Sequence, residues 1–268
     1  MSMKTAIVIP ARYGSTRFPG KPLAKIGGVP MLQRVVEIGR KAAAQYPDCT
    51  LLVATEDERV EKFCAEIDVP CVMTSDNCPT GSDRVLEAVR KSAADAEFIF
   101  GLQGDAPFTP ADAIPKMMDV VHKDKDVEVI TPVIRLRWTE LDNLREAKKI
   151  TPFSGTTAII NAQENALWFS KNIIPAIRKE DKLKEQSEFS PIHQHIGLYG
   201  FRRDVLEHFV KLPQGDYEQL EGLEQLRLIE NGISIRCVKL DVAAGLAQAG
   251  IDSPEDIERA ERLLQNAG

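Results

Sequence analysis

The sequence lacks the features by which several large classes of protein are recognised. No apolar run approaches 18 residues, so we expect neither a membrane span nor membrane insertion. The first residues show no charged segment followed by a long apolar core, so no signal peptide is expected. The five cysteines form no C-x-x-C pair, which favours the reduced thiols of a cytoplasmic protein over a disulfide framework.

The sequence also lacks two common phosphate-binding motifs, and its net charge is not positive. No G-x-G-x-x-G occurs, which weakens a dinucleotide-binding interpretation. The nearest approach to a P-loop has five residues between Gly14 and Gly20, and Pro22 follows Lys21 where Ser or Thr is required. The 40 acidic and 34 basic residues give a net charge of −6, which argues against general binding of nucleic acid.

The chain does have one focused basic loop. Residues 5–9 form a short apolar run that predicts a buried first strand, and residues 31–44 predict a helix. The loop between them carries Arg12, Arg17 and Lys21, and no acid occurs from residue 9 to residue 22. Ligands bind at the carboxyl ends of strands in open α/β sheets, and backbone N–H groups with three cations suit a polyphosphate. The alternative is a solvated basic surface loop.

Strand-like and helix-like patterns alternate through the first half of the chain. Strands are expected at 51–54, 69–73, 98–102 and 128–136, and helices at 57–67 and 83–93. This alternation predicts an α/β fold with a mostly parallel central sheet flanked by helices. This alternation of strands and helices stops at about 138–192, and we interpret these residues as a small β-containing lobe of a single domain. A returning strand at 193–201, a helix at 219–231 and a strand at 233–240 are expected after it.

Two acids far apart in the sequence are candidates for binding Mg²⁺. Asp105 follows the strand expected at 98–102, where it can face the basic loop. Asp252 lies just before Ser253 and Pro254, which begin the last expected helix. Mg²⁺ accepts one or two carboxylates together with phosphate oxygens, so two converging acids suit metal-assisted phosphoryl chemistry. For each acid the alternative is a turn or capping role at the start of a helix.

Several strings resemble one enzyme family. Residues 9–22 resemble the opening motif of the sugar-acid cytidylyltransferases, and most closely that of the 3-deoxy-manno-octulosonate cytidylyltransferases. The run Gln103-Gly104-Asp105-x-Pro107 resembles the family's metal-binding motif, and residues 250–256 resemble its closing motif. The run L-E-Q-L-R at 223–227 is a further match, and the resemblance spans residues 4 to about 262.

The resemblance implies a Rossmann-like nucleotidyltransferase fold and a homodimer formed through the lobe. It also implies that CTP and an acid sugar react to give a CMP-sugar and pyrophosphate, with Mg²⁺ held by Asp105 and Asp252. The implied catalytic residues are Arg12, Lys21 and Asp105. The implied nucleotide-binding residues are Pro10, Ala11, Arg12, Lys21, Ser75, Ser82 and Gln103. The implied sugar-binding residues are Arg84, Gln103, His195, Tyr199, Glu224 and Gln225.

The chain also departs from the family pattern. Ala106 stands where a Glu is usual, residues 154–161 lack an expected lysine-containing strand, and residues 172–191 match poorly. The departures fall near the sugar side, so a cytidylyltransferase for a sialic-acid-like or amino-modified sugar is an alternative. A nucleotide-binding protein without catalysis is another, although retention of both acids argues against it. His193 and His195 could also be read as a zinc pair, but no third ligand is apparent.

Overall fold

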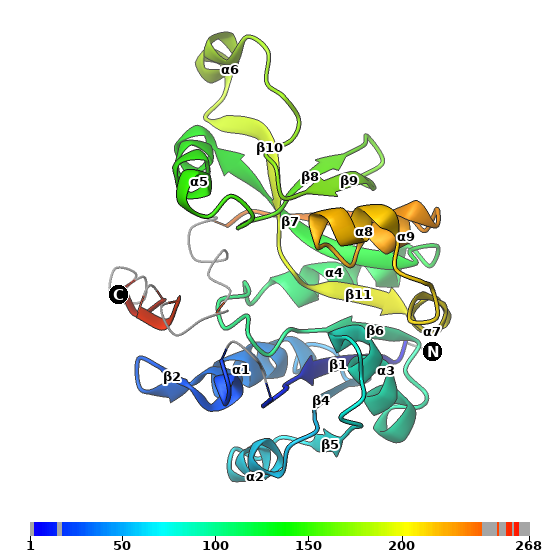
Figure 1. Cartoon of the computed structure of the whole chain (residues 1–268). Helices are drawn as coiled ribbons and strands as arrows, with labels where there is room; N and C mark the ends of the chain where they lie inside the picture. The colour runs from blue at the N-terminus through cyan, green and yellow to red at the C-terminus, as the bar shows by residue number, and fades with distance from the viewer. Residues whose placement is uncertain (1–2, 15–17, 243–250, 252–255, 259, 263–268) are drawn as a thin grey trace.

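The computed structural model describes residues 3–14, 18–242, 251, 256–258 and 260–262, and Figure 1 shows their arrangement. The strands are β1 (Thr5–Pro10), β2 (Lys25–Ile26), β3 (Val29–Pro30), β4 (Cys49–Thr55), β5 (Cys71–Met73), β6 (Phe98–Gly101), β7 (Val129–Arg137), β8 (Thr157–Ile160), β9 (Ala166–Ser170), β10 (Phe189–His195), β11 (Tyr199–Arg202) and β12 (Ile235–Leu240). The helices are η1 (Lys21–Leu23), a 3-10 turn, and α1 (Met31–Ala43), α2 (Glu58–Glu66), α3 (Gly81–Ser92), α4 (Ala113–Lys123), α5 (Trp138–Ile150), α6 (Glu180–Gln186), α7 (Arg203–Phe209), α8 (Asp216–Glu221) and α9 (Leu226–Glu230).

Strand β1 lies at the centre of the parallel half of the sheet. It pairs in parallel with β4 on one side and β6 on the other, and β5 continues the sheet beyond β4. Ile7 and Ile9 belong to one hydrophobic core, and Ala6 and Val8 belong to another. All four side chains are fully buried, as expected for a parallel strand covered by helices on both faces.

The helices divide between the two faces. The core around Ile7 includes side chains of α1, α2, α4 and α5, whereas the core around Val8 includes side chains of α3, α7 and α9. Figure 1 shows α1 and α3 next to β1 in the lower half of the molecule, with α4 between that half and the lobe. The predicted α/β fold is therefore confirmed, with helices on both faces of the sheet.

The other half of the sheet is mixed. Strands β10 and β11 both run antiparallel to β7, and β12 runs parallel to it. Along their other edges, away from β7, these two strands have different neighbours: β11 pairs with β6 of the main sheet, whereas β10 pairs with β8 of the lobe. The sheet therefore divides between β6 and β8, beside residues 196–198, which connect β10 to β11. Side chains on either side of that division can line a space there. The sheet was predicted to be mostly parallel, but it is mixed: β5, β4, β1 and β6 pair in parallel, as do β7 and β12, whereas β8 to β11 pair antiparallel with their neighbours.

Three segments differ from the expected secondary structure. The single strand expected at 193–201 is two strands, β10 and β11, with residues 196–198 between them. The polar stretch after β7 is a helix, α5, and the lobe also contains the β8–β9 hairpin and α6. The single helix expected at 219–231 is two short helices, because Gly222 adopts φ 62° and ends α8. Glu224 and Gln225 consequently lie in the turn before α9 instead of on a continuous helix face.

Along the described residues, no helix is both long enough and apolar enough to cross a membrane.

Candidate active site

Two adjoining cavities lie beside the ends of β1 and β6. The larger has a volume of about 490 Å³ and the smaller about 330 Å³; we call them the large pocket and the small pocket. Gly81, Gln103 and Asp105 line both. Gly81 is the first residue of α3, and the other two residues follow β6 directly. A molecule in one pocket can therefore react with a molecule in the other across these three residues.

The small pocket is built around the basic loop. The predicted nucleotide-binding residues Pro10, Ala11, Arg12 and Lys21 line it, and Arg12 is exposed. Lys21 is only 9% exposed, and its Nζ lies 2.7 Å from Oδ2 of Asp105, whose side chain is 45% exposed. The structure therefore brings together the three predicted catalytic residues around one cavity.

The start of α3 forms the opposite wall of the small pocket. Thr80 caps the helix by accepting the N–H of Asp83, and the Asp83 carboxylate in turn accepts the N–H of Thr80. Thr80 and Gly81 both line the pocket, so the positive end of the helix dipole faces it. This arrangement favours an anionic ligand.

Gly104 allows the two catalytic loops to meet. A Cβ at this position would lie 2.6 Å from the carbonyl oxygen of Pro10, closer than real side chains approach. Any other residue would therefore push the loop after β6 away from the loop after β1. The glycine of the Gln103-Gly104-Asp105 run is explained by this close approach, which keeps Asp105 opposite Lys21.

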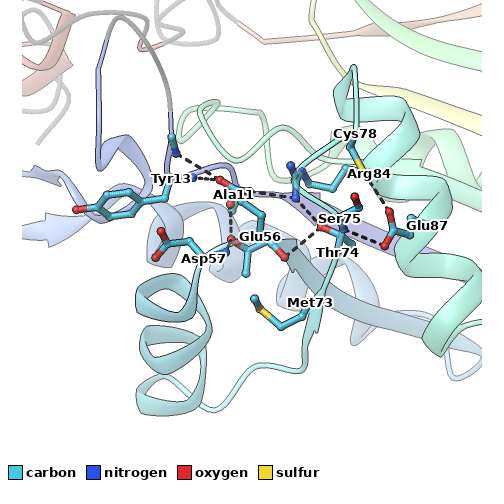
Figure 2. Close-up of polar contacts among 12 residues, drawn as sticks. Ala11, Tyr13, Glu56, Asp57, Met73, Thr74, Ser75, Cys78, Arg84 and Glu87 are labelled. Carbon is cyan, nitrogen blue, oxygen red and sulfur yellow. Dashed lines mark hydrogen bonds and ion pairs between the residues drawn. The ribbon is translucent and has the colours of Figure 1, made fainter.

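Glu56 was not identified from the sequence, yet it anchors the basic loop from the side. Its Oε1 accepts the N–H groups of Tyr13 at 2.9 Å and Gly14 at 3.3 Å. Its Oε2 lies 3.0 Å from Nη1 of Arg84, which also donates to Oγ1 of Thr74 at 2.5 Å. Figure 2 shows Glu56 between Tyr13 and Arg84. Two of the loop N–H groups that we expected to face a phosphate thus bind a carboxylate of the protein. The only signal in the sequence is an acid directly after a strand.

Two predicted binding residues lie away from their expected neighbours. Arg84 was expected to bind the sugar, but it is 2% exposed and lines the small pocket, where Gln103 is the one other predicted sugar residue among those described. Ser75 was expected to bind the nucleotide, but it lines neither pocket, and its N–H donates to Glu87 at 2.9 Å. Both roles stay predictions. Asp252 and Arg17 lie outside the described residues.

The large pocket gathers the other predicted sugar-binding residues. They come from three parts of the chain: Gln103, His195 and Tyr199, and the pair Glu224 and Gln225. Three of their buried atoms, Oη of Tyr199, Oε1 of Glu224 and Nε2 of Gln225, have no hydrogen-bond partner within the described part of the chain. A buried polar group without a partner costs about 1–3 kcal/mol, so such a cluster indicates a ligand that would satisfy it.

The imidazole of His195 is neutral and held in one tautomer. Burial lowers its pKa to about 3. Its Nε2 lies 2.9 Å from Oγ1 of Thr131, whose own hydrogen is donated to the carbonyl of Leu198 at 2.8 Å. Nε2 therefore carries the ring hydrogen, and Nδ1 is left as an acceptor. The ring packs against Phe169 and Tyr199, with centroids 5.0 and 5.2 Å away, so its orientation is fixed.

Burial also affects the pKa values of one carboxylic acid and one phenol in this wall. It raises the pKa of Tyr199 well above its usual value and raises that of Glu224, even though Ser82 donates a hydrogen bond to Glu224 at 3.1 Å. Ser82, predicted to contact the nucleotide, thus lines the large pocket and joins α3 to the turn before α9. The wall combines hydrogen-bond donors and acceptors, which suit a ligand with several hydroxyl groups.

A buried ion pair holds the turn that carries Glu224. Arg227 donates to Glu218 through Nε at 2.7 Å and Nη2 at 2.5 Å, and both side chains are 6% exposed. The pair ties α8 to α9 across the break at Gly222. Sequence reasoning missed it, because residues nine apart on one helix would not face each other in this way.

Lys148 similarly organises the lobe side of the large pocket. Its Nζ donates to the carbonyls of Ser154 at 2.5 Å, Gly155 at 3.0 Å and Lys171 at 2.6 Å. Gly155 and Lys171 line the pocket from two different segments. Burial lowers the pKa of Lys148, as expected for an ammonium group surrounded by backbone. No pattern in the sequence pointed to this lysine.

The residues present fit a bound Mg²⁺ at Asp105. Its carboxylate is partly exposed where the two pockets meet and offers the hard oxygen ligand that this ion prefers. The N–H of Ile251, the residue before Asp252, donates to the carbonyl of Asp105 at 3.2 Å. Among the residues described, no three His, Cys, Asp or Glu side chains cluster as a complete metal site. An ion here would therefore need ligands beyond them, such as phosphate oxygens.

Comparisons with known proteins agree with this geometry. A family model described as cytidylyltransferase matches residues 6–235. The chain is 42% identical over 266 residues to the 3-deoxy-manno-octulosonate cytidylyltransferase of Maricaulis maris, covering 99% of both proteins. It is 38% identical over 272 residues to the enzyme of the same name from Parabacteroides distasonis, covering 98% of this chain and 99% of that one.

A solved structure is similar along its whole length. It is that of CMP:2-keto-3-deoxy-manno-octonic acid synthetase in complex with CTP, with a TM-score of 0.81 and 34% sequence identity. The alignment covers 99% of this chain and all of that one. The sequence match and the fold match thus extend over the same nearly complete length. On this evidence the chain belongs to the 3-deoxy-manno-octulosonate cytidylyltransferase family.

Proposed function

We propose that this chain joins CTP to 3-deoxy-manno-octulosonate, giving CMP-3-deoxy-manno-octulosonate and pyrophosphate for the synthesis of lipopolysaccharide. The observation that carries the proposal is the common wall of Gly81, Gln103 and Asp105 between two chemically different pockets. The small pocket offers cations and a helix N-terminus to a nucleotide triphosphate, and the large pocket offers partners for sugar hydroxyls.

In the proposed reaction the anomeric hydroxyl oxygen of the sugar attacks the α-phosphorus of CTP. The new bond joins that oxygen to phosphorus, and the hydroxyl proton passes to water. The bond between the α-phosphorus and its bridging oxygen breaks, and pyrophosphate leaves. Lys21 and Arg12 would offset negative charge on the phosphates, since both line the small pocket. Most of the rate enhancement would come from positioning and from charge stabilisation, without a covalent intermediate.

A magnesium ion would be held by Asp105 and Asp252. When bound, Mg²⁺ neutralises phosphate charge and lowers the pKa of a hydroxyl that it contacts. Asp105 is suited to the first part of this task, because it contacts Lys21 and lines both pockets. The hydrogen bond from Lys21 to the Asp105 carboxylate holds that carboxylate in place.

The wall of the large pocket supports a hydroxylated acid sugar. Tyr199, Glu224 and Gln225 each bring a buried polar atom that a sugar hydroxyl could satisfy. A site of this kind rejects analogues that lack a bonded hydroxyl, because its own polar groups would stay unpaired. Ala106 lines the same pocket and leaves room or removes a charge where the family usually has an acid.

The test is pyrophosphate release from CTP and Mg²⁺ with a panel of acid sugars. We expect the octulosonate to be turned over fastest and CTP to be preferred over UTP and ATP. Gln225→Leu should raise the KM for the sugar, whereas Gln163→Leu, at an exposed site on the β8–β9 hairpin, should not. Faster turnover of a nine-carbon sialic acid would overturn the sugar assignment, and equal use of all nucleotides would overturn the cytidine assignment.

Two further properties belong to the proposal. The five cysteines are free thiols in the structure, which supports a reducing, cytoplasmic location. A homodimer is supported by large apolar side chains that are exposed in or near the lobe: Ile150 (86%), Phe153 (76%), Leu167 (54%) and Leu220 (79%). Light scattering should give twice the mass of the chain, and a monomer at micromolar concentration would contradict the dimer.

A further inference from the structure

We propose that Glu56 is a positioning residue that sets the basic loop for the triphosphate of the nucleotide. Its two carboxylate oxygens divide their contacts between the loop and the wall of the small pocket. Oε1 accepts the N–H groups of Tyr13 and Gly14, while Oε2 lies 3.0 Å from Nη1 of Arg84 (Figure 2). This inference rests on the proposed assignment of the nucleotide to the small pocket.

The surroundings of Glu56 make its carboxylate a fixed part of the fold. Its side chain is 12% exposed and that of Arg84 is 3% exposed, so neither can exchange its charged partner for bulk water. Thr74 holds the guanidinium from the other side and donates to the carbonyl of Thr55, while Oγ1 of Thr55 donates to the carbonyl of Ala11. The ends of β5, β4 and β1 are thereby linked, with Glu56 at the point nearest to the loop.

Arg84 shows why this contact concerns the ligand as well as the loop. It lines the small pocket, and its Nη2 is buried with no hydrogen-bond partner in the described part of the chain. Nη1 donates a hydrogen bond to Thr74 and forms an ion pair with Oε2 of Glu56, so these two residues orient the guanidinium and leave Nη2 for another acceptor. One carboxylate therefore sets the position of the loop backbone and the direction of a pocket-lining cation.

The contacts of Glu56 also allow the opposite interpretation, and an experiment can distinguish the two. A carboxylate bound by two successive N–H groups resembles an anion in a backbone nest, so Glu56 could occupy the place of a phosphate and compete with it. In that case removing its charge would strengthen the binding of CTP. In the positioning role, removing the charge weakens the contacts made by the triphosphate.

The experiment compares CTP with CMP, which share the base, the sugar and the first phosphate. Dissociation constants are measured by calorimetry for the wild type, Glu56→Gln, Glu56→Asp and Glu58→Gln. Glu58 is the matched control, an exposed acid two residues away at the start of α2. Glu56→Gln keeps the volume and an acceptor but leaves Arg84 without its counter-charge, while Glu56→Asp retains the charge.

We expect Glu56→Gln to reduce the preference for CTP over CMP by about 10- to 100-fold, the scale of losing a hydrogen bond to a charged group. Glu56→Asp should recover part of that loss, and Glu58→Gln should match the wild type. An unchanged preference in both Glu56 variants, or tighter binding of CTP by Glu56→Gln, would overturn the inference. If the wild type itself binds CTP no tighter than CMP, the proposed nucleotide site fails instead.

Amide hydrogen exchange gives a measurement that does not depend on ligand binding. The N–H groups of Tyr13 and Gly14 should exchange slowly in the wild type and in Glu58→Gln, and faster in Glu56→Ala. Melting curves establish which variants are folded at the assay temperature. If Glu56→Ala is unfolded, the same comparison is made with Glu56→Gln, and retained protection with a retained CTP preference would then count against the role of Glu56.

Discussion

Replacing Lys21 with methionine should separate the catalytic charge of the small pocket from the stability of the fold. The side chain of Lys21 is 11% exposed, and its Nζ lies 2.7 Å from Oδ2 of Asp105. Methionine retains a flexible apolar chain of similar length, so packing around the stem of Lys21 should survive. The ammonium group is the part that is lost.

The expected change in stability depends on how far Lys21 and Asp105 are each exposed to solvent. Asp105 is 45% exposed, so water can solvate its carboxylate once the ammonium is gone. Ion pairs with this much solvent access contribute about 0–1 kcal/mol to stability. Loss of one preorganised charge donor raises the activation free energy by about 2–4 kcal/mol. That corresponds to a decrease in kcat/KM of about 30- to 1,000-fold.

The assays are pyrophosphate release at saturating Mg²⁺ and unfolding in urea, with Lys25→Met as the control. Lys25 is an exposed lysine on β2, so its replacement should alter neither quantity. A value of kcat/KM for Lys21→Met within about threefold of the wild type would refute the catalytic role. A decrease of several kcal/mol in the free energy of unfolding would refute the argument from exposure.

Three other predictions use the same two measurements. Asp105→Asn and Asp252→Asn should each abolish most turnover while leaving the fold intact, because an amide keeps the volume and loses the ligand charge; a near-normal Mg²⁺-dependent rate would remove that residue from the metal site. Arg227→Met should lower the free energy of unfolding by about 3–5 kcal/mol because Glu218 would be left as a buried charge without its partner, whereas Lys149→Met, in an exposed pair with Glu146, should cost less than about 1 kcal/mol. Equal losses would contradict this difference. The pKa of His195 is about 3 in the fold and about 6.5 when unfolded, so the unfolded state binds more protons between these values and stability should fall as the pH drops from about 6.5; His195→Gln should flatten that slope in urea titrations at pH 4.5 to 7, and an unchanged slope would contradict the assignment.

The parts of the fold that were predictable depend on local periodicity. Strand β1 is buried on both faces and reads as a continuous apolar run, and the helices after it begin and end within a few residues of their expected positions. The mixed half of the sheet could not be predicted in the same way, because the pairing of β10 with both β7 and β8 depends on contacts between segments that are distant in the sequence. Helix α5 was missed because its apolar face is narrow, with Trp138, Leu141 and Leu144 as its buried side chains.

The break at Gly222 shows how a local error can conceal a functional arrangement. The pattern from 219 to 231 fits a helix, and nothing in it indicates that a left-handed glycine would divide the segment. In the fold, the division places Glu224 and Gln225 at the wall of the large pocket. The resemblance of L-E-Q-L-R to a family motif identified these residues, although helical periodicity would have placed them on a solvated face.

The residues that line the pockets and the residues that hold them in place differ in how far sequence reveals them. Lys21 lies in the loop that follows β1, Asp105 lies in the loop that follows β6, and His195 lies at an alternating position of β10, so their location follows from rules of sheet geometry. Glu56 and Lys148 contact backbone groups of other segments. Because nearly every residue has a backbone N–H and a carbonyl, the sequence does not indicate which of them a side chain will contact. Contacts of this kind become visible only when the tertiary fold is known. Variants of Glu56 and Lys148 should therefore change binding at pockets whose lining residues are all intact.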